Sequence, residues 1–82
     1  MCLALPAEVV SLSNDDDSAV VSLEGVKKQI SLALVEDVKI GDFVLVHVGY
    51  ALHKVSPEEA ERTLSLMAEA GVLKQEVEEF SQ

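Results

Sequence analysis

The sequence predicts a mainly β fold, a small OB-like barrel of about five strands followed by a C-terminal helix. Eleven of the 13 valines precede Ser56, and none lies between Ser56 and Gly71. Because β-branched side chains favour strands, the valines indicate a strand-rich first two-thirds and a helical end. Short strands separated by tight turns are typical of a small barrel, with a small open sandwich as the alternative. We expect one domain, with an N-terminal cysteine arm and the barrel in residues 1–55 and the helix and an acidic tail in residues 56–82.

The first three strands are expected to follow one another through short turns. Glu8–Ser13 is the first predicted strand, and the polar run Asn14–Ser18 favours a solvated turn rather than a calcium loop, which would need further ligands at set spacing. Ala19–Glu24 alternates between apolar and polar residues, as a half-buried strand does. Gly25 then supplies the positive φ of a tight turn, and Val26–Leu34 continues the alternation as a long third strand.

The last two strands follow a connector over Val35–Asp42. Phe43–Val48 is apolar at nearly every position, so we expect a strand that is buried on both faces. Gly49 ends it, and Tyr50–Val55 forms a short fifth strand.

A helix is expected to begin after Ser56, which is a good N-cap. Pro57 suits the first helical position, Glu59 completes a capping box, and Gly71 is a good terminator. Val72–Gln82 leaves room for another turn of helix, and we expect its acidic run Glu76–Glu79 to be frayed rather than folded. One apolar stripe should dock the helix on the barrel, with Met67 in the core rather than acting as a ligand: Ala60, Leu64, Met67 and Ala68, broadened by Leu66 and Ala70.

Composition and charge exclude several functions. The chain has 82 residues, with 15 acidic residues against six Lys and Arg, a net charge of −9 and a single cysteine. A domain of this length has a radius of gyration of about 12 Å and little room for an enclosed active site, so we expect no enzyme activity of its own. Nucleic acids and anionic membranes need clustered basic residues, whereas here the closest basic pair is Lys27–Lys28. Without an apolar run near 18 residues, a secretory signal or a second cysteine, we expect a cytoplasmic protein in a reducing setting.

Cys2 is the first candidate for chemistry. If Met1 is removed, this residue carries both a thiol and an α-amino group, and a nearby ammonium lowers the pKa of a thiol. The thiolate is the form that binds metals. An inert or partly buried terminal cysteine is the alternative reading.

His47 is the second candidate, because it interrupts an otherwise apolar strand. It is either a core histidine with hydrogen-bond partners or a metal ligand or proton partner. His53 is expected at the surface. One thiol and one or two imidazoles cannot fill the four positions of a closed zinc site, so a site shared with a partner is chemically easier.

The two best candidates lie in two segments that resemble a known family. Met1–Val9 reads Met-Cys-Leu-Ala-Leu-Pro-Ala-Glu-Val, and Gly41–Leu52 reads Gly-Asp-Phe-Val-Leu-Val-His-Val-Gly-Tyr-Ala-Leu. Together they resemble the two motifs of the HypC/HupF family of accessory chaperones for [NiFe]-hydrogenase. Cys2 and His47 match the thiol and the histidine of these motifs. The second motif is further supported by Gly41, Asp42, Gly49 and Tyr50.

This resemblance implies an OB-like barrel with a C-terminal helix, and a role in metallocentre assembly. It implies a complex with the maturation partner HypD, on which the Fe(CN)₂CO unit is assembled, and binding to the precursor of the hydrogenase large subunit. Iron in this form would be a transient cargo shared with a partner, with no organic cofactor. Cys2 would then lie on a flexible arm with apolar partner contacts from Leu3, Leu5 and Pro6.

Two other functions stay open on the residues alone. A generic OB-type module that binds a protein or peptide would make Cys2 incidental. A small metalloenzyme would need more ligands than the candidates offer.

Overall fold

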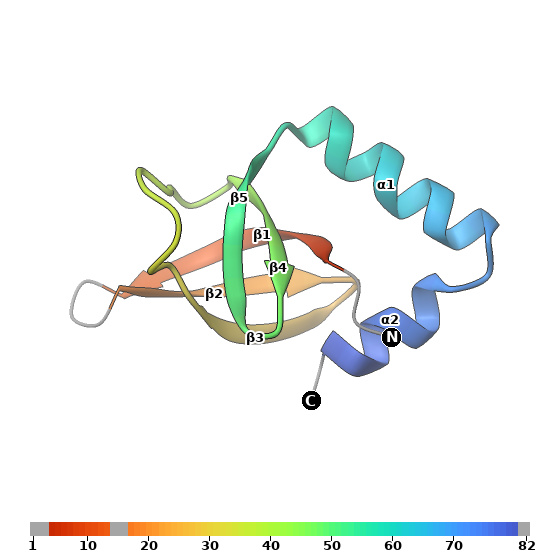
Figure 1. The fold of residues 1–82 in the computed structure, drawn as a ribbon, viewed down its shortest axis with the longest axis horizontal. Helices are drawn as coiled ribbons and strands as arrows, with labels where there is room; N and C mark the ends of the chain where they lie inside the picture. Colours follow the sequence, from red (N-terminus) through yellow and green to blue (C-terminus); the bar gives the residue numbers. More distant parts are fainter. Residues whose placement is uncertain (1–3, 14–16, 81–82) are drawn as a thin grey trace.

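Five strands close into a barrel in the order β1-β2-β3-β5-β4, with β4 paired back to β1 (Figure 1). All neighbouring strands are antiparallel except β3 and β5, which meet at one parallel pair. This closed barrel fits the predicted OB-like fold and excludes the open sandwich. The computed structural model describes residues 4–13 and 17–80, and its Cα radius of gyration is 11.8 Å. The strands are β1 (Leu5–Ser13), β2 (Ser18–Leu23), β3 (Val26–Ser31), β4 (Phe43–His47) and β5 (Tyr50–Val55).

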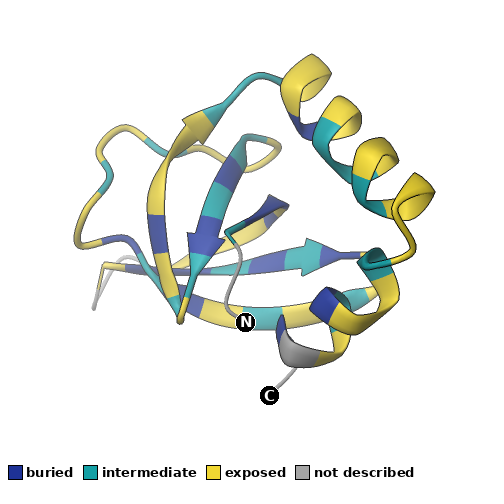
Figure 2. Cartoon of the chain, turned by 45° about the vertical axis from the view of Figure 1, so that its right-hand side comes forward, coloured by how far each residue is buried: buried dark blue, intermediate teal, exposed yellow. Residues whose placement is uncertain are grey.

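The inner face of the barrel is filled by small and medium aliphatic side chains. Alternate residues of each strand point inward, because successive side chains of a strand face opposite sides. Figure 2 shows the resulting alternation of buried and more exposed positions along the strands. The buried core consists of Leu5, Ala7, Val9, Ala19, Val21, Leu23, Ile30, Leu32, Val44, Val46, Ala51 and Phe80.

The first strand begins earlier than predicted. It starts at Leu5 rather than Glu8, and Leu5 and Pro6 are both buried in it. The expected arm therefore cannot include these two residues in this structure. Leu3 and Cys2 lie outside the described residues, as do Asn14, Asp15 and Asp16 of the expected turn.

The third strand is shorter than predicted, ending at Ser31 instead of Leu34. The reason is a turn that follows the strand directly. The amide of Leu32 still donates to the carbonyl of Asp17 (2.8 Å), next to β2. The amide of Val35 then donates back to the carbonyl of Leu32 (3.1 Å), which closes a turn and takes residues 33–34 out of the strand.

The fourth strand is buried on one face only, so the expectation of burial on both faces was wrong. Val44 and Val46 lie in the core, whereas Phe43, Leu45 and His47 are only half-buried on the outer face. The strand is flanked by β1 and β5 within the barrel wall, which covers its edges rather than its outer face.

The first helix, α1 (Pro57–Glu69), has the predicted ends. The Oγ of Ser56 accepts a hydrogen bond from the amide of Glu59 (3.1 Å). At the other end Gly71 has φ +77°, and the amide of Val72 donates to the carbonyl of Met67 (3.1 Å), which is the pattern of a Schellman cap.

The apolar stripe of α1 is narrower than predicted. Ala60 is buried, and Leu64 and Met67 pack against the core, as expected. The predicted broadening fails, because Leu66 and Ala70 are exposed, and Ala68, predicted within the stripe itself, is exposed as well.

The acidic run Glu76–Glu79 is helical rather than frayed, which corrects that prediction. Helix α2 (Leu73–Phe80) packs Val77 and Phe80 against the core, and the Nζ atom of Lys28 lies 5.9 Å from the centre of the Phe80 ring. The two helices form a hairpin beside one end of the barrel (Figure 1). Neither helix, nor any other in the described ranges, is long and apolar enough to cross a membrane.

Candidate functional site

Closure of the barrel brings the two sequence motifs together. Leu5 pairs with Val46, and Pro6 pairs with Leu45, although β1 and β4 are far apart in the sequence. Cys2 lies outside the described residues, and two residues, Leu3 and Ala4, stand between it and Leu5 in the sequence. The β1–β4 pairing sets Leu5, the first residue of β1, opposite Val46, which directly precedes His47.

His47 is half-buried on the outer face of β4 and is paired with Tyr50 across the hairpin. Within the described ranges, residues 4–13 and 17–80, the imidazole ring of His47 forms no hydrogen bond or ion pair. A core histidine would be buried and hydrogen-bonded, because burying an unpartnered imidazole is costly. Its half-buried position contradicts the core-histidine alternative, and among the described residues neither ring nitrogen of His47 has a hydrogen-bond partner.

A tight turn presents His47 at the end of its strand. Val48 and Gly49 have φ of 51° and 82°, which is the signature of a type I′ hairpin. Positive φ is unfavourable for a β-branched residue, so Val48 is strained. The carbonyl of Gly49 accepts the hydrogen bond from Ser31, so the turn is also fixed to the end of β3.

The other end of β4 is fixed by the Gly41-Asp42 part of the motif. Gly41 has φ +97°, and its amide donates to the carbonyl of Val9 (2.8 Å). The amide of Val9 in turn donates to the carbonyl of Asp42 (2.8 Å). These two bonds attach the turn before β4 to β1. Gly41 is needed here for its backbone conformation and not for space, because a Cβ would meet nothing within 4 Å.

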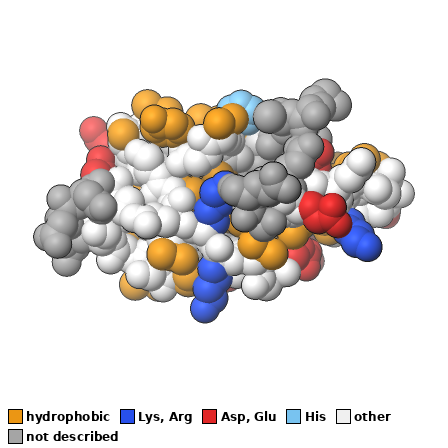
Figure 3. Space-filling model, turned by 90° about the horizontal axis from the view of Figure 1, so that it is seen from below, with side chains coloured by type: hydrophobic (Ala, Val, Ile, Leu, Met, Phe, Trp, Pro, Cys, Tyr) orange, Lys and Arg blue, Asp and Glu red, His pale blue; other side chains and the backbone are white. Residues whose placement is uncertain are grey.

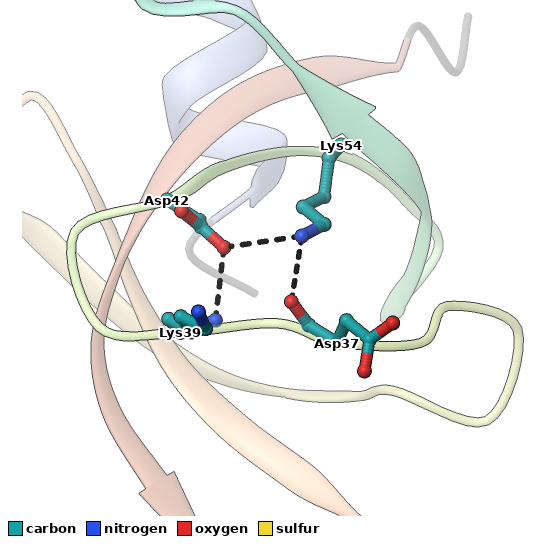
Figure 4. Close-up of polar contacts among 4 residues, drawn as sticks. All are labelled: Asp37, Lys39, Asp42 and Lys54. Carbon is teal, nitrogen blue, oxygen red and sulfur yellow. Dashed lines mark hydrogen bonds and ion pairs between the residues drawn. The ribbon is translucent and has the colours of Figure 1, made fainter.

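The carboxylate of Asp42 adds a polar clamp, shown in Figure 4. Its Oδ2 atom accepts a hydrogen bond from the amide of Lys39 (2.9 Å) and lies 3.6 Å from the Nζ atom of Lys54. The same ammonium donates to the carbonyl of Asp37 (2.6 Å). Gly41, Asp42 and Gly49 therefore hold the two ends of β4, and with it His47, in place.

Exposed hydrophobic side chains surround the turn that follows His47. Val48 is 70% exposed, Tyr50 47% and Leu52 37%. In Figure 3, hydrophobic side chains gather beside a histidine along one edge of the face seen from below. Tyr50 was among the predicted motif residues, whereas Val48 and Leu52 were not. The Val48-Gly49 pair between two predicted strands is the signal from which Val48 could have been assigned to a hairpin turn.

The remaining histidine does not belong to this site. His53 is exposed, as predicted, and its Nδ1–H donates to the carbonyl of Lys54 (3.0 Å). Among the described residues, no group of three or more His, Cys, Asp or Glu side chains is arranged to hold a metal ion. The motif residues therefore offer one imidazole and, from outside the described ranges, one thiol.

Comparison with known proteins finds similarity to members of a single family. Residues 1–67 match the model of the HupF/HypC family. The chain is 61% identical over 69 residues to the hydrogenase maturation factor HypC of Cupriavidus necator, covering 84% of this chain and 76% of that protein. It is 59% identical over 69 residues to HypC of Rhizobium leguminosarum bv. viciae, covering 84% and 91%. It is 51% identical over 76 residues to HypC of a Synechocystis strain, covering 88% and 100%.

Proposed function

The chain belongs to the HupF/HypC family, and from this membership we propose that it is a chaperone of hydrogenase maturation. Within that role, it takes part in assembling the Fe(CN)₂CO unit together with a HypD-type partner. It then delivers the unit to the precursor of the [NiFe]-hydrogenase large subunit. It acts as a carrier and not as an enzyme.

The observation that supports this proposal best is the β1–β4 pairing. It holds the segment that follows Cys2 against the strand that ends in His47. Two donors at most come from the motifs, which is too few for a closed metal site and suits a cargo whose other ligands come from elsewhere.

The chemistry of the two side chains fits the cargo. Iron that carries cyanide and carbon monoxide is a soft, low-spin centre, and a thiolate is a suitable anchor for it. A single thiolate anchor also allows transfer between proteins, because only one bond to this chain has to break. His47 is placed to orient or protonate groups near the iron, or to bind the metal weakly.

The surroundings of His47 suit contact with other proteins. Val48, Tyr50 and Leu52 add exposed apolar surface next to it, and a tyrosine is among the residue types that contribute most to binding at protein interfaces. We assign this surface to the HypD-type partner and the precursor, which would meet the cargo there in turn.

Complementation tests the proposal. A strain that lacks its own family member, and so lacks hydrogenase activity, is supplied with the wild-type protein or with Cys2→Ala, His47→Ala or His53→Ala. Cys2→Ala should abolish hydrogenase activity and precursor binding without changing the thermal unfolding of the chaperone. His47→Ala should lower activity several-fold, whereas His53→Ala is the matched control and should behave as wild type. Full activity with Cys2→Ala would overturn the proposal.

A further inference from the structure

A second surface feature does not include His47 and lies between the helical hairpin and the end of the barrel. It consists of two adjoining hollows of about 530 and 490 Å³. Both are lined by Glu24 of the β2–β3 turn, Ala68 of α1 and Leu73 of α2, so they form one continuous cleft. We call it the hairpin cleft.

The hairpin cleft has an apolar lining. Phe43 and Leu64 contribute to one hollow, Val77 to the other, and Ala68 and Leu73 to both. Leu64 and Val77 are partly buried because they also pack on the core. Grooves of this kind recognise the apolar face of an amphipathic segment.

The charged residues of the hairpin cleft are mostly acidic. Glu24, Glu61 and Glu78 line it, with Lys74 as its one cation. Glu78 already has a partner within the molecule. For Glu24 and Glu61 no hydrogen bond or ion pair is recorded within the described part of the chain, so their charges are not neutralised there.

We propose that the hairpin cleft binds an amphipathic segment of a partner protein, one whose apolar side chains are flanked by Lys or Arg. The apolar lining would take the anchors, and Glu24 and Glu61 would take the flanking cations. Charge complementarity of this sort selects partners and speeds their association. A second copy of this chain is a poor occupant, because both copies carry a net charge of −9.

The inference goes beyond the proposed function and does not depend on Cys2. One wall of the hairpin cleft is α2, which supplies Leu73, Lys74 and Val77. The match to the family model ends at residue 67, before α2 begins. The hairpin cleft would thus give the chaperone a binding site that does not include Cys2 or His47 and that takes one wall from beyond the family-model match.

Binding of designed peptides tests the proposal on the full-length chain. The probe is a fluorescein-labelled peptide on the order of 14 residues, with Leu at helical i, i+3, i+4 and i+7 positions and Lys on its flanks. A matched peptide carries Glu in place of Lys, and a scrambled peptide keeps the composition of the probe. Fluorescence anisotropy should show binding of the Lys probe only, and this binding should weaken as salt is added.

Two pairs of variants locate the binding. Glu61→Lys should weaken binding of the Lys probe about five-fold, whereas Glu69→Lys, the same charge change on α1 outside the cleft lining, should change it less than about two-fold. Ala68→Arg should weaken it at least about ten-fold by filling the cleft, whereas Leu66→Arg, at an exposed site elsewhere on α1, should not. Thermal unfolding checks that all four variants are folded.

Three results would overturn the proposal. The first is no binding of the Lys probe, or equal binding of the Glu and scrambled peptides. The second is equal weakening by Glu61→Lys and Glu69→Lys, which would reduce the effect to net charge. The third is a dimer, seen by sedimentation, that Ala68→Arg breaks and Leu66→Arg does not, because a second copy would then occupy the cleft. None of these results depends on hydrogenase activity, so they are separable from a failure of the proposed function.

Discussion

The β1–β4 pairing and the helical hairpin are held in place to different extents. Four consecutive residue pairs, from Leu5↔Val46 to Glu8↔Phe43, join the two strands through the backbone, and the inward side chains of these strands are also buried in the core. The hairpin is held by a few side chains, because Ala60 is the one buried residue of α1 and α2 relies on packing by Val77 and Phe80. The pairing can therefore keep a histidine on its outer face at little cost in stability, whereas the hairpin depends on its apolar contacts.

The strongest test of this contrast is to weaken the strand pairing from its inner face. Val44 is fully buried, and Val44→Ala should lower the free energy of unfolding by about 2–3 kcal/mol, since it removes two buried methyl groups and leaves a cavity. Denaturant unfolding measures this value. Leu34→Ala at a 61% exposed position is the control and should cost less than about 0.5 kcal/mol. Equal costs would mean that the barrel interior is not the main source of stability.

A smaller effect is expected at the hairpin. Phe80→Ala should cost about 1–2 kcal/mol, less than a central core substitution, because α2 can detach while the barrel stays closed. Hydrogen exchange should show that amides of α2 lose protection and those of β1 and β4 keep it. Loss of protection in all three elements together would show that the hairpin and the barrel unfold as one unit.

The strained turn next to His47 offers a change in the opposite direction. Val48→Asn should raise the free energy of unfolding by about 0.5–1 kcal/mol, because asparagine tolerates the positive φ of a type I′ turn far better than valine. Val48→Ala is the control and should give little or no gain, since alanine keeps most of the backbone strain. A matching gain for both variants would assign the effect to the exposed side chain instead of the backbone.

The polar clamp before β4 should have the smallest effect. Asp42→Asn should cost about 0.5 kcal/mol, because it keeps an acceptor for the Lys39 amide but removes the charge that faces Lys54. Asp37→Asn makes the same charge change, yet Lys54 is bonded to the backbone carbonyl of Asp37 and not to its carboxylate. Asp37→Asn should therefore be neutral in thermal unfolding. If Asp37→Asn destabilised the protein more than Asp42→Asn, the carboxylate of Asp42 would not be the group that stabilises this turn.

Most of the fold was predictable because its signals are local. Alternation at Ala19, Val21 and Leu23 gives the inner face of β2, and Ser56 and Gly71 mark the ends of the first helix. The prediction that β4 is buried on both faces was wrong, because an apolar side chain such as Leu45 carries no information on whether another element covers it. The helical structure of Glu76–Glu79 in α2 was not predicted, because its acidic residues outweighed an apolar stripe at helical spacing, formed by Leu73, Val77 and Phe80.

The candidate residues Cys2 and His47 stand out in the sequence as a thiol and an imidazole in two motifs, and their role stays a prediction. The pairing of β1 with β4, which joins the described parts of the two motifs, depends on barrel closure, a long-range contact that no local pattern encodes. The supporting roles of Gly41 and Gly49 also became specific only in the structure, which shows that each provides a positive φ at one end of β4.

The most direct test of the central claim, that the Cys2 thiol carries the iron unit beside His47, is infrared spectroscopy of the copurified complex. The chaperone is purified from cells that express the hydrogenase genes, as wild type, Cys2→Ala, His47→Ala and the control His53→Ala. Wild type and His53→Ala should show cyanide and carbonyl bands with bound iron, Cys2→Ala should show neither, and His47→Ala should show shifted or weaker bands. Undiminished bands and iron content in Cys2→Ala would contradict the claim.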